Sequence, residues 1–254
     1  MTRKPKTEPD TGQFTEWFNY LKLPYSLAHC ESLAQQAARE SWSHRQFLAT
    51  LLEGEVNAKH DRATQRRIKQ ARLPVLKTLE QFQWDWPKKV NPLQVKQLFR
   101  LQFVQDKTNV IFLGGVGLGK THLGIALSYT ACLRGYSVLF TTAVELINTL
   151  NAAQKLGRLK LDIQKYIKPQ VLCIDELGYL PFDKTGVSWL FQVISKRYEQ
   201  ASTIITTNKV FKQWPEIFNN DATVTSAVLD RLLHHAETVL IEGKSFRMKE
   251  QIES

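Results

Sequence analysis

The sequence contains only three cysteines in 254 residues, Cys30, Cys132 and Cys173. They are odd in number and far apart, which excludes a disulfide framework and a four-cysteine zinc site. Long apolar runs are also missing, because no stretch reaches the roughly 18–20 residues that a membrane-spanning helix needs. The charged N-terminus is followed by no apolar segment, which argues against a secretory signal. Together these absences predict a cytoplasmic protein with reduced thiols.

Acidic residues are in the minority, with 24 Asp and Glu against 34 Lys and Arg, a net charge of +10. This excess favours a polyanionic partner, because neutralising phosphates releases their counterions. Hydrophobic residues make up 43% and charged residues 23% of the chain. These are ordinary values for a globular protein, so a disordered or fibrous chain is excluded.

Glycine is scarce in the first 90 residues, which contain only Gly12 and Gly54. Apolar periodicity there predicts three helices, at 14–21, from 26 or 29 to 39, and at 43–72. Prolines and tryptophans punctuate the segment that follows. We therefore expect a helical N-terminal domain for DNA or partner binding in residues 1–80, a linker in 81–95 and a second domain in 96–254.

The second domain alternates short apolar runs with helical stretches. This pattern predicts an α/β fold with a parallel sheet that helices cover on both faces. The expected strands are 110–113, 137–141, 171–175, 203–207 and 238–241. The expected helices are 120–134, 143–153, 158–167, 185–200 and 223–235.

A glycine-rich loop of the form G-x-x-x-x-G-K-T follows the first expected strand. Backbone N–H groups must approach phosphate oxygens closely in such a loop, and a Cβ would block that approach. Lys120 would neutralise the β- and γ-phosphates, and the Thr121 hydroxyl would bind Mg²⁺. The pattern predicts ATP and Mg²⁺ as cofactors, although a glycine-rich turn without a ligand is the alternative. The expected binding residues are Gly114, Gly115, Val116, Gly117, Leu118, Gly119, Lys120, Thr121 and His122, the last with no catalytic role.

Two carboxylates, Asp175 and Glu176, end the apolar strand that begins at Val171. At the C-terminal edge of a parallel sheet, Asp175 would face the phosphate loop and hold Mg²⁺, while Glu176 would orient and polarise an attacking water. The alternative is an ordinary exposed strand end. Asn208 ends the next strand and would reach the γ-phosphate if that strand lies beside the first. Otherwise Asn208 simply caps a turn.

Four segments together resemble IstB, the helper ATPase family of insertion-sequence transposition: GGVGLGKTHL, IDELGYLPFD, LFQVISKRYEQASTIITTN and LDRLLHHAETVLIEGKSFR. The string DELGYLP is the most specific of them. The family belongs to the AAA+ ATPases and is close to the DnaC helicase loaders. The resemblance implies an AAA+ P-loop core that follows a small all-helical domain.

The resemblance also implies a biological role. Such proteins form homo-oligomers with ATP on double-stranded DNA, help to select the target site, and recruit or activate an IstA-like transposase, while hydrolysis drives disassembly. By motif, Asp175 and Glu176 match the family's Walker B pair, and Asn208 matches its sensor.

Arg231 matches the family's arginine finger, which completes the site of a neighbouring subunit by offsetting charge in the transition state. Taken alone, the sequence favours a surface ion pair of Arg231 with Asp230 or Glu237 instead. Arg247 is left open between a second sensor of nucleotide or DNA and a residue with no such role.

Two basic stretches are candidate DNA contacts. The first is a cationic stripe on the third expected helix, and the second lies before the Asp175 strand. Neither has interleaved aromatics, which favours contact with a duplex backbone over base stacking. Solvated helix faces are the alternative. The candidate residues are Lys59, Arg62, Arg66, Arg67, Lys69 and Arg72, and then Lys155, Arg158, Lys160 and Lys165.

Three functions compete on this sequence. The first is the ATP-dependent regulator of transposition. The second is a helicase loader of the DnaC kind, which would prefer single strands and bind a replicative helicase. The third is a metabolic P-loop kinase, which the adjacent carboxylates and the arginine motif disfavour.

Overall fold

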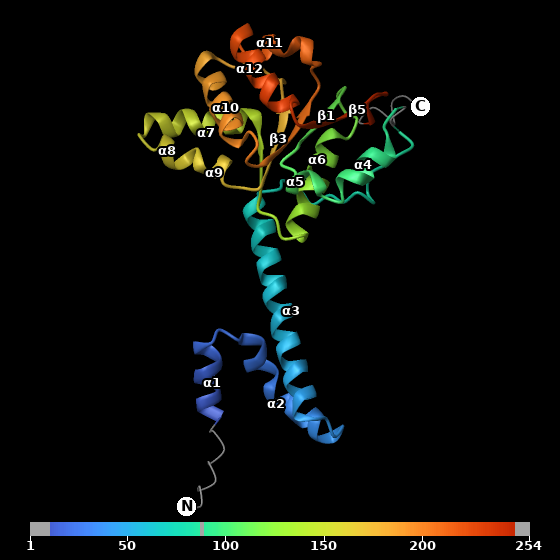
Figure 1. The fold of residues 1–254 in the computed structure, drawn as a ribbon, viewed down its shortest axis with the longest axis vertical. Coiled ribbons are helices and arrows are strands. Elements are labelled where there is room, and N and C mark those ends of the chain that lie inside the picture. Colours follow the sequence, from blue (N-terminus) through green and yellow to red (C-terminus); the bar gives the residue numbers. More distant parts are fainter. Residues whose placement is uncertain (1–10, 87–88, 247–254) are drawn as a thin grey trace, which may run out of the picture. The chain divides into compact units, whose positions relative to one another are not determined.

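The computed structural model describes residues 11–86 and 89–246. It divides into two compact units, Met1–Gln65 and Arg66–Ser254 (Figure 1). Within the described residues, no helix is both long enough and apolar enough to cross a bilayer. The third helix continues from the first unit into the second, and each unit is described separately below.

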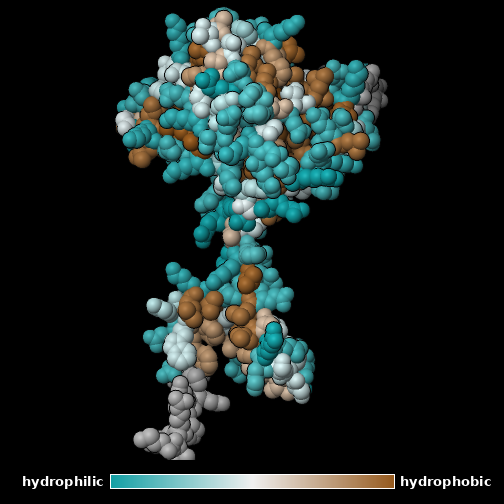
Figure 2. Space-filling view, in the orientation of Figure 1, coloured by the Kyte–Doolittle hydropathy of each residue, from teal (hydrophilic) through white to brown (hydrophobic). Residues whose placement is uncertain are grey.

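The first unit is built from α1 (Thr11–Tyr20), α2 (Pro24–Arg39) and the first part of α3 (His44–Ala71). These bounds confirm the three helices expected from apolar periodicity. Proline in the first turn of α2 suits a helix start, because its missing N–H would have no partner there. Apolar side chains remain exposed on this unit and gather into patches in Figure 2.

A buried carboxylate holds α2 to α3 in this unit. Glu55 accepts hydrogen bonds from the Ser26 backbone N–H at 2.9 Å and from the Arg62 guanidinium at 3.0 Å. Burial alone would raise the pKa of Glu55, but these donors outweigh it and the pKa lies below its ordinary value.

The second unit contains a five-stranded sheet with the strand order β2-β3-β4-β1-β5. All four neighbouring pairs are parallel. The strands are β1 (Asn109–Gly114), β2 (Val138–Thr142), β3 (Val171–Leu177), β4 (Ser202–Thr207) and β5 (Ala236–Ile241). The parallel sheet of five strands and its α/β class confirm the expectation from sequence.

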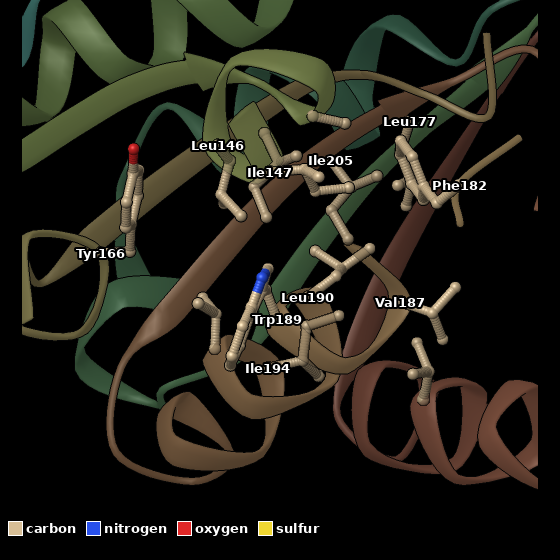
Figure 3. Packing of buried hydrophobic residues seen from close by; sticks show 14 of the residues in the cluster. Leu146, Ile147, Tyr166, Leu177, Phe182, Val187, Trp189, Leu190, Ile194 and Ile205 are labelled. Atoms are coloured by element: carbon tan, nitrogen blue, oxygen red, sulfur yellow. The ribbon is translucent and has the colours of Figure 1, made fainter. Parts of the chain in front are cut away.

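Helices cover both faces of this sheet, because its strands are apolar on both sides. On one face, Ile111, Ile174 and Ile205 pack against α7 (Ala143–Lys155), α10 (Lys184–Arg197) and α12 (Ala222–Leu233). Figure 3 shows Ile205 near Ile147 of α7 and Leu190 of α10. On the other face, Val110 and Phe112 pack against α4 (Pro92–Leu98), α5 (Gln102–Gln105) and α6 (Lys120–Leu133).

Several short elements differ from the sequence expectation. The helix expected at 158–167 is two short helices, α8 (Leu159–Asp162) and α9 (Gln164–Ile167). No element was expected at α4, where Asn91 caps the first turn and Pro92 begins the helix. Two more unexpected elements, η1 (Phe211–Gln213) and α11 (Trp214–Ile217), lie between β4 and α12.

Candidate functional site: a nucleotide pocket at the carboxyl edge of the sheet

The phosphate loop joins β1 to α6 and wraps the N-terminus of that helix. Gly117 and Gly119 have φ of +74° and +84°, a region that side chains rarely adopt. A Cβ on Gly119 would lie 2.6 Å from the Phe82 ring, so glycine is required there by packing as well. The Lys120 Nζ donates to the Gly115 carbonyl at 2.5 Å, which places its charge across the loop.

Asp175 lies at the carboxyl end of β3, where the sequence placed it, and its side chain is buried. The Thr121 hydroxyl, at the start of α6, donates to Asp175 Oδ1 at 2.9 Å. The Thr206 hydroxyl of β4 donates to the same oxygen at 2.5 Å. The structure thus brings Thr121 and Asp175 together, although they are 54 residues apart.

Glu176 occupies an irregularity in β3. The pairing of β3 with β4 shifts register between Ile174 and Leu177, and Glu176 has φ of +58°. Its N–H donates to the Thr206 hydroxyl at 3.0 Å, and its side chain is exposed. This bulge turns Glu176 out of the strand at the same edge as the phosphate loop.

Thr206 is a site residue that the sequence reasoning missed. Its hydroxyl accepts from Glu176 and donates to Asp175, so one side chain orients both carboxylate-bearing residues. Threonine is common in strands, so its presence in the expected strand 203–207 did not indicate this role.

Asn208 directly follows β4, and its side chain is exposed. The structure meets the condition stated for Asn208, because β4 lies beside β1 and pairs Leu113 with Thr207. Because parallel strands end at one edge, Asn208 lies at the edge that also carries the phosphate loop and Asp175.

A cavity of about 460 Å³ adjoins the loop, within the usual size range of ligand pockets. Its walls come from the segment 75–86, the phosphate loop, the start of α6 and Phe246. The Trp86 indole N–H donates to the Lys244 carbonyl at 2.9 Å, and the Phe246 N–H donates to the Gly117 carbonyl at 2.9 Å. The segment 75–86 and the residues that follow β5 are far apart in the sequence, but together they line the cavity beside the phosphate loop.

His122 connects this wall to α6. Its Nε2 lies 2.8 Å from the Thr78 carbonyl, and its ring meets Phe82 edge to face at 5.6 Å. Burial lowers the pKa of His122 below the ordinary histidine value. These contacts give His122 a structural place in the pocket wall.

Arg231 lies in the last turn of α12 and is half-buried. Its Nη1 donates to the Ala227 carbonyl at 2.9 Å, and its guanidinium lies 5.1 Å from the centre of the Phe191 ring. Over the described chain, Arg231 has no ion pair with Asp230 or Glu237, the alternative that the sequence favoured. Arg247 lies outside the described residues.

Two cations of the first basic stretch have structural partners. Arg62 pairs with the buried Glu55 in the first unit. In the second unit, the Arg67 Nε donates to the Cys132 carbonyl at 3.0 Å. The other four members, Lys59, Arg66, Lys69 and Arg72, are exposed.

The second basic stretch surrounds α8 and α9. Asp162 forms an ion pair with Lys165 at 2.5 Å and lies 3.9 Å from Arg158. Its negative charge therefore offsets part of the positive charge of this stretch. Lys155 and Lys160 are exposed. Nearby, the buried Arg197 donates to the carbonyls of Tyr166, Ile167, Pro169 and Ser202, which fixes the end of this stretch to β4.

Comparison with known proteins places this chain. Residues 17–254 match the model of the IstB-like ATP binding proteins. The chain belongs to this family. The IstB-like chain is 44% identical over 231 residues to an insertion-sequence protein of Pseudomonas aeruginosa, named as the ATP-binding protein of IS21, covering 91% of this chain and 87% of that one.

Solved structures show the fold of the IstB-like chain. It resembles AMPPCP-bound DnaA from Aquifex aeolicus with a TM-score of 0.56 and 23% identity, over 72% of this chain and 56% of that one. It resembles the DnaC helicase loader with a TM-score of 0.52 and 20% identity, over 65% of this chain and 96% of that one. The fold is therefore the AAA+ fold, as the resemblance implied.

Proposed function

We propose that this IstB-like protein is an ATP-dependent, DNA-binding regulator of transposition. It assembles with ATP on double-stranded DNA, helps to select the target site, and recruits or activates an IstA-like transposase. Hydrolysis then dissolves the assembly. The match of residues 17–254 to the IstB-like family supports the role in transposition. The 2.9 Å hydrogen bond between Thr121 and Asp175, which joins the phosphate loop to the acidic end of β3, supports the nucleotide site.

The residues at this point fit Mg²⁺. A hydroxyl and a carboxylate are the oxygen donors that this cation takes, and two ligands suit an ion that keeps several waters. Thr121 and Asp175 would hold it, and it would neutralise charge on the β- and γ-phosphates. Asp175 accepts a hydrogen bond from each of two hydroxyl groups on one oxygen, and these contacts fix the orientation of its carboxylate toward the phosphate loop.

The remaining roles follow from position. Lys120 would exchange the Gly115 carbonyl for phosphate oxygens. Glu176 would orient and polarise the attacking water, since its side chain is exposed at the same sheet edge. Asn208 would contact the γ-phosphate or that water from the end of β4. The aromatic wall of the 460 Å³ cavity would accept the adenine base by stacking.

Arg231 supports completion of the site by a neighbouring subunit. Its described contacts are the Ala227 carbonyl and the Phe191 ring, neither of which belongs to the phosphate loop of its own chain. An arginine that stabilises transition-state charge in a neighbour makes hydrolysis depend on assembly. ATP binding would then favour oligomer formation, because two neighbouring subunits would contribute residues to the same site.

We assign DNA binding to the exposed residues of the two basic stretches. The sequence suggests a DNA- or partner-binding domain in residues 1–80, a linker in 81–95 and an ATPase domain in 96–254. The second unit begins at Arg66 and residues 75–86 line its cavity, so we assign DNA or partner binding to the first unit and ATPase activity to the second. The structural relative DnaA has also been solved with AMPPCP and single-stranded DNA. Because the basic stretches lack interleaved aromatics, we assign this chain a duplex instead.

The test is duplex binding by the full chain with ATP, with ADP and without nucleotide, at one fixed salt concentration. We expect tight binding only with ATP, and Lys120→Ala should bind equally weakly under all three conditions. Lys196→Ala, which removes an exposed lysine of α10, is the matched control and should behave as wild type. If the wild type binds duplex DNA with the same affinity under all three conditions, the proposed control of DNA binding by ATP is wrong.

A helicase loader remains the second candidate, because the fold is shared with the DnaC loader. A pull-down against helicase and transposase of the same host separates the two. Capture of the helicase and preference for single strands would replace the transposition assignment.

A further inference from the structure

Three potential metal ligands meet at the edge of the sheet opposite the phosphate loop. Glu199 lies between α10 and β4, while His234 and His235 lie between α12 and β5. The N–H of Asn109, the first residue of β1, donates to the His235 carbonyl at 2.8 Å. Because the phosphate loop follows the other end of β1, this cluster takes no part in the nucleotide pocket.

The ligand atoms converge. Glu199 Oε1 lies 3.9 Å from His234 Nδ1 and 3.8 Å from His235 Nε2. All three atoms lie within 4.8 Å of one another. Around a tetrahedral Zn²⁺ with bonds of about 2.0–2.1 Å, neighbouring ligand atoms are about 3.3 Å apart. The two distances from Glu199 exceed this value by about half an ångström, and rotations of three exposed side chains can close these gaps and the remaining distance between the two histidines.

We propose that Glu199, His234 and His235 form a Zn²⁺ site. Two imidazoles and one carboxylate are a donor set that zinc takes, and a water would fill the fourth position. The Tyr198 hydroxyl lies 2.8 Å from His234 Nδ1, so it must yield this nitrogen to the metal and can then hydrogen-bond to a ligand or the bound water.

The site would connect two helices that already share a contact. Glu199 follows the end of α10, and the histidines follow the end of α12. One ion would hold these two ends together without using the nucleotide. Zinc that binds only the folded chain would therefore also stabilise the second unit against unfolding.

The experiment titrates Zn²⁺ into the untagged, metal-stripped and nucleotide-free full chain by calorimetry. We expect one equivalent at micromolar affinity and a rise in melting temperature. Glu199→Gln and His235→Ala should each weaken binding about tenfold or more, since losing an outer partner alone costs a metal site about 10- to 100-fold. Co²⁺ should give the visible absorption of a tetrahedral site with the wild type.

His60→Ala is the matched control, because it removes an exposed histidine from α3 and should leave the affinity unchanged. Both site variants alter exposed side chains, and circular dichroism verifies that they fold. The proposal is overturned if the wild type takes up no zinc. It is equally overturned if Glu199→Gln and His235→Ala both bind zinc as the wild type does, or if His60→Ala weakens binding as much as they do.

Discussion

The guanidinium of Arg231 lies over the ring of Phe191, 5.1 Å from its centre, and so joins α12 to α10. A cation over an aromatic face is attracted by about 0.5–1 kcal/mol at an exposed position. The contact keeps the arginine on the surface of its own helices while leaving its charge without a carboxylate partner among the described residues. This is the condition that an arginine acting on a neighbour requires.

We expect Arg231→Ala to lower ATP turnover by about 10³-fold or more, the range measured for such fingers. Nucleotide affinity of the isolated subunit should change little, because the hydrogen bond and the ring contact of Arg231 are both made with α10 and α12, away from the phosphate loop. Steady-state turnover and equilibrium binding of a fluorescent ATP analogue measure the two effects. Unchanged turnover would mean that the finger is misassigned.

Mixing variants tests whether the finger acts in trans. Glu176→Gln subunits keep Arg231, and Arg231→Ala subunits keep Glu176, so a mixed assembly contains composite sites with both groups intact. We expect the mixture to regain turnover that neither variant shows alone. A mixture as inactive as its components would place Arg231 in the site of its own chain.

Glu176→Gln should bind ATP normally and hydrolyse it about 10²- to 10⁴-fold more slowly, since the amide cannot act as a base. The exposed side chain makes a loss of stability unexpected. The variant should therefore stay on duplex DNA long after ATP is added, as measured by dissociation rate. Dissociation at the wild-type rate would separate disassembly from hydrolysis.

Thr206→Val should reduce turnover although it touches neither nucleotide nor DNA in the proposal. Valine keeps the shape but removes the hydroxyl that donates to Asp175 and accepts from Glu176. The buried hydrogen bonds should cost about 1–3 kcal/mol of stability. Thr206→Ser keeps the hydroxyl and should retain turnover. If Thr206→Ser loses turnover as Thr206→Val does, the methyl group and its packing matter and the hydroxyl does not.

The double variant Arg66→Gln, Lys69→Gln should reduce the salt dependence of DNA affinity. Each lost phosphate contact lowers the slope of log affinity against log salt by about 0.9, so two lower it by about 1.8. Lys184→Gln, Lys196→Gln makes the same change in net charge on α10 and is the control. Equal slopes for both double variants would show that only net charge acts.

The sequence predicted the sheet well, because apolar strands alternating with amphipathic helices leave few arrangements. The sequence motifs also predicted that Asp175 faces the phosphate loop, but the order of the strands in the sheet was not predicted. Thr206 was missed since its role depends on the bulge at Glu176, and a bulge has no signature in residue types. The pocket wall was missed because Trp86 and Lys244 are 158 residues apart and only folding brings them together.

That wall has a consequence for damaged gene copies. Lys89 and Glu242 pair as an antiparallel bridge, and Phe246 hydrogen-bonds to the phosphate loop. A stop codon shortly after β5 would leave the phosphate loop, Asp175, Glu176 and Arg231 in place while removing Phe246 from the wall of the cavity. The truncated protein would still be recognised from its sequence as an IstB-like protein, but we expect it to bind ATP poorly.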